Sequence, residues 1–433
     1  METLWKKRTR VFPSLNENME TEVLVVGGGI CGLLTAYKLS LTGHQVVVVE
    51  ADEIGSHRTG KSTAVITALQ DVYYSDLVES IGYDRTKLFL KANLEAIEEY
   101  KKLAEEFVFD FEEVSSYKYS ENLEKLQNEF LTLAKLGYHA NLVNHLRYLH
   151  QSGNAIVFEN QGQMNPIMLI DALASKLTIF EHSKVDQIKN KIAYIGSYQI
   201  KADKIVIATG YPFYRWRGGF YMKLTQKKSF VISLKKEVNQ PTNAIGGRAN
   251  DLYFRTYKDS LVVGGNDMPT GRLCDFYEPL EAFKDSYAAN TPVEYKWVNQ
   301  DCVTLDGMPY IGKYRFLKDV YVATGFNLWG MTGSMISAMV ISDLINEKTN
   351  HYAKLFHPYR SMLVVPLVKN IMTALINLVN FKKPKCTHFG CALVWNKEEE
   401  CYECPCHGSK YDKDGKPIET PALEDLKKKD QLD

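Results

Sequence analysis

The apolar and polar positions near the start of the chain predict a strand, a helix and a second strand in close succession. Val23 to Val26 is a short β-branched run, which is typical of a buried parallel strand. A helical pattern begins near Gly32 and is stopped by Gly43, and Val46 to Val49 form the next buried run. The opening therefore predicts a strand–helix–strand unit within a parallel sheet.

Three glycines and an acid give this unit a predicted ligand. Gly27, Gly29 and Gly32 have the spacing G-x-G-x-x-G directly after the first strand, and Glu50 ends the second strand. Such glycines allow a tight turn, close approach of the backbone to a pyrophosphate, and close packing of helix on strand. The helix N-terminus favours the phosphates, and the acid suits a ribose. We expect a dinucleotide here, and the motif alone does not separate FAD from NAD.

The middle of the chain shows two other patterns. Apolar residues at helical spacing over Asp84 to Phe107 and over Leu123 to Leu133 predict two scaffold helices. Between Arg215 and Lys296 the pattern changes to alternating positions rich in Tyr, Phe and Val. This change predicts an inserted antiparallel sheet, which we expect to cover a substrate cavity.

The chain then returns to the first domain. Val320 to Ala323 predicts a strand, Gly325 to Gly330 a glycine loop, and Thr332 the start of a helix. A second helix N-terminus would then face the dinucleotide site, where its partial positive charge suits an anionic ring.

Composition and charge narrow the class of protein. The chain has 433 residues, 45% hydrophobic and 24% charged, which is ordinary for two or three globular domains. Lys plus Arg and Asp plus Glu both number 52, so no net field attracts nucleic acid or an anionic membrane. No secretory signal pattern precedes the first strand. Polar residues interrupt the apolar segment Met362 to Phe381, which we interpret as a packed or interfacial helix. We expect a cytoplasmic protein without a transmembrane segment.

Five motifs in this order resemble the D-amino-acid oxidase-like family of FAD-dependent oxidoreductases. They are VVGGGICG with Glu50, TGKSTA, IVIATG, DGMPYIG and ATGFNLWGMTGS. The resemblance implies FAD as a cofactor and hydride transfer from a carbon that bears an amine. The cofactor-binding residues expected from the motifs and the resemblance are Gly27, Gly29, Gly32, Glu50, Arg58, Thr59, Ser62, Thr63, Val185, Thr209, Gly210, Gly325, Gly330, Met331 and Thr332.

One position departs from the family. Relatives that oxidise amino acids usually carry an arginine before DG-x-P-x-IG, where it holds the substrate carboxylate, whereas this chain has Asp301. An aspartate cannot replace a guanidinium fork. Either Arg255 or Arg248 from the inserted sheet holds a carboxylate, or Asp301 receives a cationic amine, or Asp301 is a capping residue. Asp301 and Arg255 are thus the candidate substrate contacts.

Cysteines crowd into the C-terminal part, which favours metal binding. Cys386 and His388 form C-x-H, and Cys404 and His407 form C-x-x-H. Two thiolates and two imidazoles from two loops match a Rieske [2Fe–2S] centre. A Cys₂His₂ zinc site is the rival, although its usual ligand order and spacing differ.

The same stretch resembles the loop pair of Rieske proteins, through CTHFGC and CPCHGS. That resemblance implies a disulfide between Cys391 and Cys406. The chain departs from it in one respect, because only residues 381–385 separate the preceding helical segment from Cys386. The small sheet that normally supports the cluster is therefore expected to be abbreviated.

The predicted fold class is α/β: a Rossmann-like parallel sheet that binds FAD, an inserted antiparallel substrate sheet, and a small Rieske-type β module. The predicted divisions are 1–214 for the FAD-binding domain with a helical insert at about 84–150, 215–299 for the substrate domain, 300–350 for the return to the FAD-binding domain, 351–383 for a linker helix, and 384–433 for the Rieske module.

Two redox sites on one chain favour a dehydrogenase. A flavin takes two electrons as hydride and can release them singly, which suits a one-electron cluster. The hypothesis is that an amine or amino-acid-like substrate reduces FAD, and the electrons pass through the cluster to an unknown acceptor. The alternatives are an oxidase that uses oxygen beside a structural cluster, and a non-catalytic redox-sensing partner protein. An NAD dehydrogenase is disfavoured because the late glycine loop has no role in one.

Overall fold

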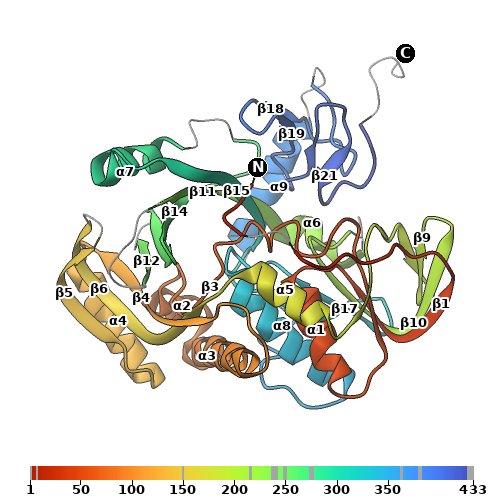
Figure 1. Cartoon of the computed structure of the whole chain (residues 1–433), viewed down its shortest axis with the longest axis horizontal. Coiled ribbons are helices and arrows are strands. Elements are labelled where there is room, and N and C mark those ends of the chain that lie inside the picture. The colour runs from red at the N-terminus through yellow and green to blue at the C-terminus, as the bar shows by residue number, and fades with distance from the viewer. Residues whose placement is uncertain are drawn as a thin grey trace.

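The computed structural model describes residues 2–5, 8–148, 151–213, 217–235, 242–246, 251–272, 277–360, 364–378 and 383–426. Arg248, one of the two arginines considered as a carboxylate clamp, lies outside these ranges. Figure 1 shows two large sheets with helices between and beside them, and a small module stacked on one of these sheets. Among the described residues, no helix combines the length and the apolar character needed to cross a bilayer.

An eight-stranded sheet is built around the first strand. Its strands are β1 (Met19–Val26), β2 (Val46–Val49), β7 (Thr178–Phe180), β8 (Gln187–Lys189), β9 (Ile192–Ile195), β10 (Tyr198–Gly210), β16 (Tyr310–Lys313) and β17 (Val320–Thr324). Strands β17, β10, β1, β2 and β7 run parallel in this order. Side chains of β1 and β2 are buried on both faces, which explains their uninterrupted apolar runs.

Helices cover one face of this sheet. The helices within the described ranges are α1 (Ile30–Ser40), α2 (Tyr74–Ile81), α3 (Tyr83–Glu106), α4 (Leu123–Leu136), α5 (Pro166–Ala174), α6 (Phe220–Lys223), α7 (Glu278–Ala288), α8 (Gly330–Ile345) and α9 (Val364–Leu378), with a 3₁₀ turn η1 (Arg217–Gly219). Helices α1, α3 and α8 share the largest apolar core with strands of the sheet. Capping residues define the ends of α4. The side chain of Asn122 accepts a hydrogen bond from the N–H of Lys125 at its start, and Gly137 ends the helix at a φ of 89°.

A second, nine-stranded sheet stands over the carboxyl ends of the parallel strands. Its strands are β3 (Val65–Ile66), β4 (Glu112–Ser120), β5 (Asn141–Tyr148), β6 (Gln151–Gln163), β11 (Leu224–Leu234), β12 (Thr242–Gly246), β13 (Tyr253–Tyr257), β14 (Ser260–Pro269) and β15 (Val293–Thr304). The sheet is thus larger than the predicted insert. Strands β4 and β5 fall within the insert predicted to be helical, and β15 continues past residue 299. The sequence pattern did not predict β4, because several of its buried positions are polar, including Ser116, Lys118 and Ser120.

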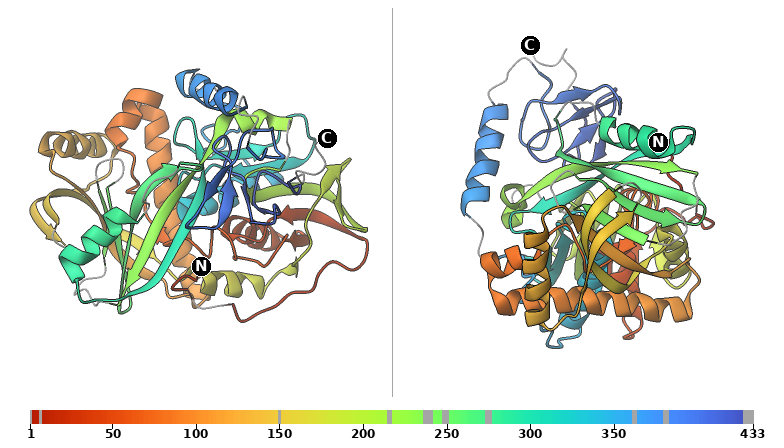
Figure 2. Two further views of the ribbon diagram at one scale, coloured as in Figure 1. Left: turned by 90° about the horizontal axis from the view of Figure 1, so that it is seen from above. Right: turned by 90° about the vertical axis from the view of Figure 1, so that its left-hand side faces the viewer.

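The C-terminal module has its own four-stranded antiparallel sheet. Its strands are β18 (Val394–Asn396), β19 (Cys401–Glu403), β20 (Lys410–Tyr411) and β21 (Pro417–Glu419). All four strands follow the first cysteine–histidine loop, so the support for that loop comes from the chain after it. Helix α9 precedes the loop and lies on the outside of the molecule (Figure 2).

Candidate dinucleotide and metal-cluster sites

A cavity of about 490 Å³ opens at the carboxyl ends of the parallel strands. Its volume is in the range of small-molecule and cofactor sites. Most of the predicted cofactor-binding residues line it: Gly27, Gly29, Glu50, Arg58, Thr59, Ser62, Val185, Thr209, Gly210, Gly330 and Met331. The remaining four, Gly32, Thr63, Gly325 and Thr332, are not among its lining residues.

The N-terminus of α1 is shaped for a phosphate. A Cβ on Gly27 would meet the carbonyl oxygen of Ala208 at 2.6 Å, and one on Gly32 would meet the oxygen of Gly27 at 1.9 Å. Glycine is therefore required at both positions. Gly29 caps α1 without a side-chain hydrogen bond, and the Thr59 hydroxyl accepts from Ile30 N. These residues fit the diphosphate of FAD, which the helix N-terminus and nearby hydroxyls would hold.

A second helix N-terminus faces the same cavity. Gly330 and Met331 start α8 and line the cavity, and α8 has no side-chain cap. Asp301 of β15 is buried, lines the cavity, and accepts hydrogen bonds from Cys302 N and Leu328 N. Burial raises the pKa of Asp301. This aspartate therefore fastens the loop before α8 to the second sheet.

Arg255 does not lie at the cavity. Its guanidinium is fully buried in the second sheet, where it donates to Gln163 and to the carbonyl of Met164 and packs over the rings of Trp5 and Tyr257. Burial lowers its pKa to about 9. Arg255 is not among the residues that line the cavity, although its Nη1 has no hydrogen-bond partner among the described residues, so its role as a carboxylate clamp stays a prediction.

An acid that sequence reasoning missed lies beside the roof of the cavity. Asp267 on β14 is next to Ser229, which pairs across the strands with the cavity-lining Asn299. Ser229 Oγ is 2.9 Å from the hydroxyl of Tyr253. Burial, with a smaller contribution from the nearby Asp71, raises the pKa of Asp267 to about 6. Oδ1 of Asp267 has no hydrogen-bond partner among the described residues.

The four predicted cluster ligands converge between two loops of the C-terminal module. Cys386 and Cys404 are buried and hydrogen bonded through their sulfurs, which lowers the pKa of Cys386 and raises the pKa of Cys404. The hydroxyl of Tyr411 also donates to Cys386 Sγ, at 3.3 Å. The ring centroids of His388 and His407 are 4.9 Å apart. The sulfur pair and the imidazole pair are thus both buried, and both are held by the same two loops.

The hydrogen bonding of His407 suits a metal ligand. Nε2 is 2.9 Å from the carbonyl oxygen of Tyr221 in α6, an acceptor that requires the proton to be on Nε2. Nδ1 then carries a lone pair, and it is buried without a hydrogen-bond partner in the described part of the chain. A backbone carbonyl that orients an imidazole in this way is the usual outer contact of a metal-bound histidine. The residues therefore fit a [2Fe–2S] cluster held by Cys386, Cys404, His388 and His407.

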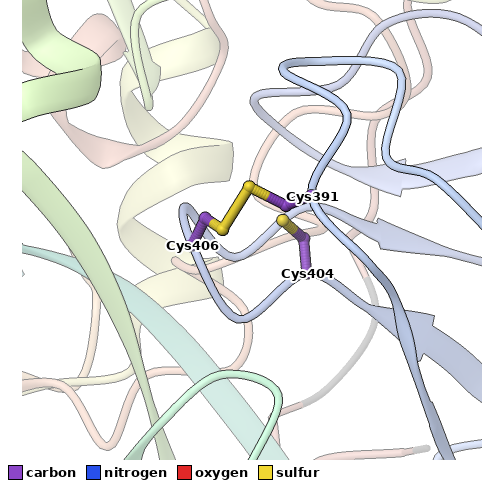
Figure 3. A group of neighbouring side chains, drawn as sticks. All are labelled: Cys391, Cys404 and Cys406. Atoms are coloured by element: carbon purple, nitrogen blue, oxygen red, sulfur yellow. A yellow bond between two sulfur atoms is a disulfide. The ribbon is translucent and has the colours of Figure 1, made fainter. Parts of the chain in front are cut away.

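The structure contains the disulfide between Cys391 and Cys406 (Figure 3). It joins the two loops beside Cys404, whose sulfur lies within 4.8 Å of both bonded sulfurs. Since two of these three sulfurs are bonded to each other, the trio is a clamp on the loops and not a separate metal site.

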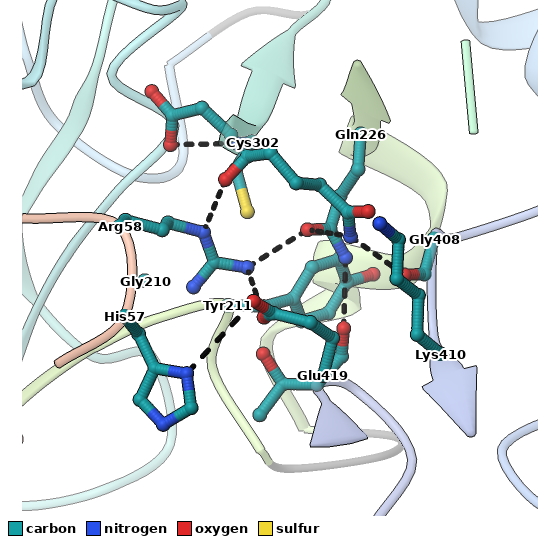
Figure 4. Close-up of polar contacts among 12 residues, drawn as sticks. His57, Arg58, Gly210, Tyr211, Gln226, Cys302, Gly408, Lys410 and Glu419 are labelled. Carbon is teal, nitrogen blue, oxygen red and sulfur yellow. Dashed lines mark hydrogen bonds and ion pairs between the residues drawn. The ribbon is translucent and has the colours of Figure 1, made fainter. Parts of the chain in front are cut away.

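The two sites are joined by a buried polar network (Figure 4). Gln226 on β11 donates to the carbonyl of His407 at 2.7 Å and accepts from Arg58 at 2.8 Å. Gln300 on β15 donates to the carbonyl of Gly408 at 2.7 Å. A Cβ on Gly408 would meet Gln226 at 2.6 Å, so the second loop approaches β11 as closely as glycine permits.

The module also forms part of the cavity wall. Residues of β21 and the loop after it line the cavity, among them Pro417, Glu419 and Leu423. Glu419 is 3.3 Å from Arg58 and 4.0 Å from Nδ1 of His57. Burial opposes its charge, but Arg58 and His57 outweigh burial, and the pKa of Glu419 is lowered.

A separate contact fixes the module on the outer face of β11. Lys228 is fully buried and pairs with Glu403 at 2.7 Å and with Glu399 at 3.2 Å. Gly271 N donates to the other oxygen of Glu403 at 2.8 Å. These contacts, with the glutamine network, hold the module firmly on the second sheet.

Comparison with known proteins agrees with both sites. Residues 22–344 match the family described as FAD dependent oxidoreductase (DAO), and residues 379–429 match the Rieske [2Fe-2S] domain. The chain is 29% identical to the "Putative Rieske 2Fe-2S iron-sulfur protein YhfW" of Bacillus subtilis, over 99% of this chain and 97% of that one. It is 23% identical to gamma-glutamylputrescine oxidoreductase of Escherichia coli, over 80% of this chain and 89% of that protein. The solved L-proline dehydrogenase from P. horikoshii has a similar fold, with a TM-score of 0.69, 19% identity, and coverage of 79% of this chain and 98% of that one.

Proposed function

The chain belongs to the DAO family of FAD dependent oxidoreductases and carries a Rieske [2Fe-2S] domain, and from this premise we propose that it is an amine dehydrogenase. When bound, FAD supplies hydride acceptance from the carbon beside the substrate nitrogen, and the cluster supplies one-electron transfer to an acceptor. The protein binds and orients both groups and the substrate.

The proposal rests mainly on Tyr211. This residue directly follows Gly210 of the cavity wall, and its ring centroid is 6.2 Å from that of His388. Tyr211 is fully buried, and burial raises its pKa well above the ordinary value. One neutral, buried residue thus adjoins the cavity wall through its chain neighbour Gly210 and a predicted cluster ligand through its ring. Such a short, dry connection favours electron transfer within the chain.

The charges around the cavity support an amine as the substrate. Asp301 stands where relatives that oxidise amino acids have an arginine, and Arg255 is buried elsewhere. Asp267 does not itself line the cavity, but its neighbour Ser229 pairs with the lining residue Asn299, and its Oδ1 has no hydrogen-bond partner among the described residues. A carboxylate in this position stabilises a substrate ammonium and repels a free carboxylate. We therefore propose Asp267 as the contact for a cationic amine, and a role for Asp301 in holding the loop at α8.

Anaerobic rapid mixing of the holoenzyme with a panel of primary and secondary amines tests this function. We expect bleaching of the flavin band first and then the appearance of the reduced-cluster signal in electron paramagnetic resonance. Flavin reduction without cluster reduction would remove the electron-transfer step. Failure of every amine to bleach the flavin, with both cofactors present, would favour a redox-sensing partner protein instead.

The full-length variant Cys404→Ser separates a dehydrogenase from an oxidase. Loss of the cluster should leave flavin reduction by amine intact and stop turnover with a one-electron dye as acceptor. If the variant and the wild type instead consume oxygen and release peroxide at the same rate, the cluster is structural and the enzyme is an oxidase.

A further inference from the structure

Helix α9 presents a broad apolar face to solvent. Its exposed apolar side chains follow the helical spacing i, i+3, i+4, i+7, i+8, with one more residue beside this stripe. They are Val368 (52% exposed), Ile371 (40%), Met372 (50%), Leu375 (51%), Ile376 (68%) and Leu378 (38%). Contiguous exposed apolar side chains of this kind mark an interaction surface.

The opposite face of the same helix is fastened to the protein. Asn370 donates to the carbonyl of Met222 at 3.4 Å, and the carbonyl of Asn377 accepts from Ala392 N at 2.9 Å. Ala374 packs against the apolar core that contains Cys386. The apolar stripe therefore points outward from a fixed helix at the edge of the molecule (Figure 2).

The charge of the sequence around α9 indicates which kind of partner its apolar stripe binds. No Asp or Glu occurs from Lys348 to Lys397, although the whole chain has equal numbers of acidic and basic residues. Lys369 falls within the helix, and Lys382, Lys383 and Lys385 follow it closely. A second copy of this surface would bring like charges together, whereas anionic lipid headgroups would pair with the lysines.

We propose that α9 anchors the protein to the surface of an anionic lipid membrane. The helix lies in the interface with its apolar stripe among the acyl chains, and the lysine-rich sequence around it favours anionic headgroups. It does not cross the bilayer, since it has 15 residues and four lysines in or just after it. Because its inner face packs beside Cys386, this arrangement brings the first cluster loop close to the lipid surface.

Co-sedimentation of the holoprotein with lipid vesicles tests the proposal. We expect binding to phosphatidylcholine vesicles that contain phosphatidylglycerol, weaker binding to phosphatidylcholine alone, and loss of binding as salt is added. The variant Ile371→Ser/Leu375→Ser/Ile376→Ser should lower the partition coefficient by more than about tenfold. The variant Lys382→Gln/Lys383→Gln should lower binding to anionic vesicles by about tenfold and leave the weak binding to neutral vesicles unchanged.

A matched control is Val11→Ser/Val108→Ser, which removes two side chains that are 87% and 84% exposed elsewhere. It should bind vesicles like the wild type, and unchanged flavin and cluster spectra verify the fold of every variant. Absence of vesicle binding, or equal binding by the triple variant, would overturn the proposal. So would a dimer in lipid-free solution that the triple variant abolishes, since the stripe would then be an interface between copies. These readouts do not depend on amine turnover.

Discussion

The side-chain amide of Gln226 donates a hydrogen bond to the backbone carbonyl of His407 over 2.7 Å, across 181 residues of sequence. The same side chain accepts from Arg58 at the wall of the predicted FAD cavity. One glutamine therefore connects the loop of a predicted cluster ligand with the predicted flavin site.

Replacement of Gln226 by Leu should uncouple the two sites. The change leaves the carbonyl of His407 and the guanidinium of Arg58 without this partner, at a cost of about 1–3 kcal/mol in the stability of the docked module. In anaerobic rapid mixing, we expect flavin reduction at the wild-type rate and cluster reduction slowed by about tenfold or more. The exposed Gln187→Leu serves as the control. Equal slowing of both steps would mean that Gln226 acts on the flavin cavity itself.

The ion pair between Glu419 and Arg58 should make the free energy of unfolding decrease as the pH is lowered. The pKa of Glu419 is lowered in the fold, so its stabilising effect is complete above its ordinary value of 4.5 and is lost as the pH falls through the lower folded value. Glu419→Gln should therefore lower the melting temperature by a few degrees at pH 7, and the difference from wild type should shrink below pH 4.5. Differential scanning calorimetry across this range measures it. A difference that is constant with pH would show that charge is not involved.

Asp267 should control substrate affinity. Its pKa of about 6 means that the carboxylate is lost as the pH falls through 6, while a typical amine stays cationic. For the wild type, KM for the amine should rise below pH 6 with little change in kcat. In Asp267→Asn, KM should be about 10- to 100-fold higher at pH 7.5 and should not change between pH 5 and 7. The exposed Asp259→Asn is the control. A KM that is unchanged in Asp267→Asn would exclude the amine contact.

The disulfide should protect the cluster. Without the bond, the two cluster loops lose a crosslink that closes a segment of about 15 residues and is worth roughly 3 kcal/mol. The variant Cys391→Ser/Cys406→Ser should keep its flavin and lose its iron faster on exposure to chelator. Absorbance of the cluster over time measures this loss, and Cys401→Ala provides a control cysteine in the same module. Zinc found in place of iron in the wild-type protein would contradict the cluster assignment altogether.

Local motifs account for what the sequence predicted well. The glycines of the first unit and the two cysteine–histidine pairs are short patterns whose chemistry follows from spacing alone. The structure places Gly27 and Gly29 at a cavity and buries Cys404 and His407 in one loop, and their roles as cofactor and cluster ligands stay predictions.

Long-range contacts account for what the sequence did not predict. Gln226, Glu419 and Asp267 are ordinary polar residues of strands, and only the fold brings them to the sites. The position of Arg255 also follows from the fold, since its burial over Trp5 depends on two segments 250 residues apart in the sequence. The strand β4 was not predicted because its buried positions carry polar side chains, so the sequence lacks the alternation of apolar and polar residues that is typical of a strand.

The wall that β21 contributes to the cavity has a consequence for the predicted flavin site. The cavity is closed on this side only when the C-terminal module is folded and docked on the second sheet. Undocking of the module would therefore remove this wall and expose the predicted flavin site to solvent.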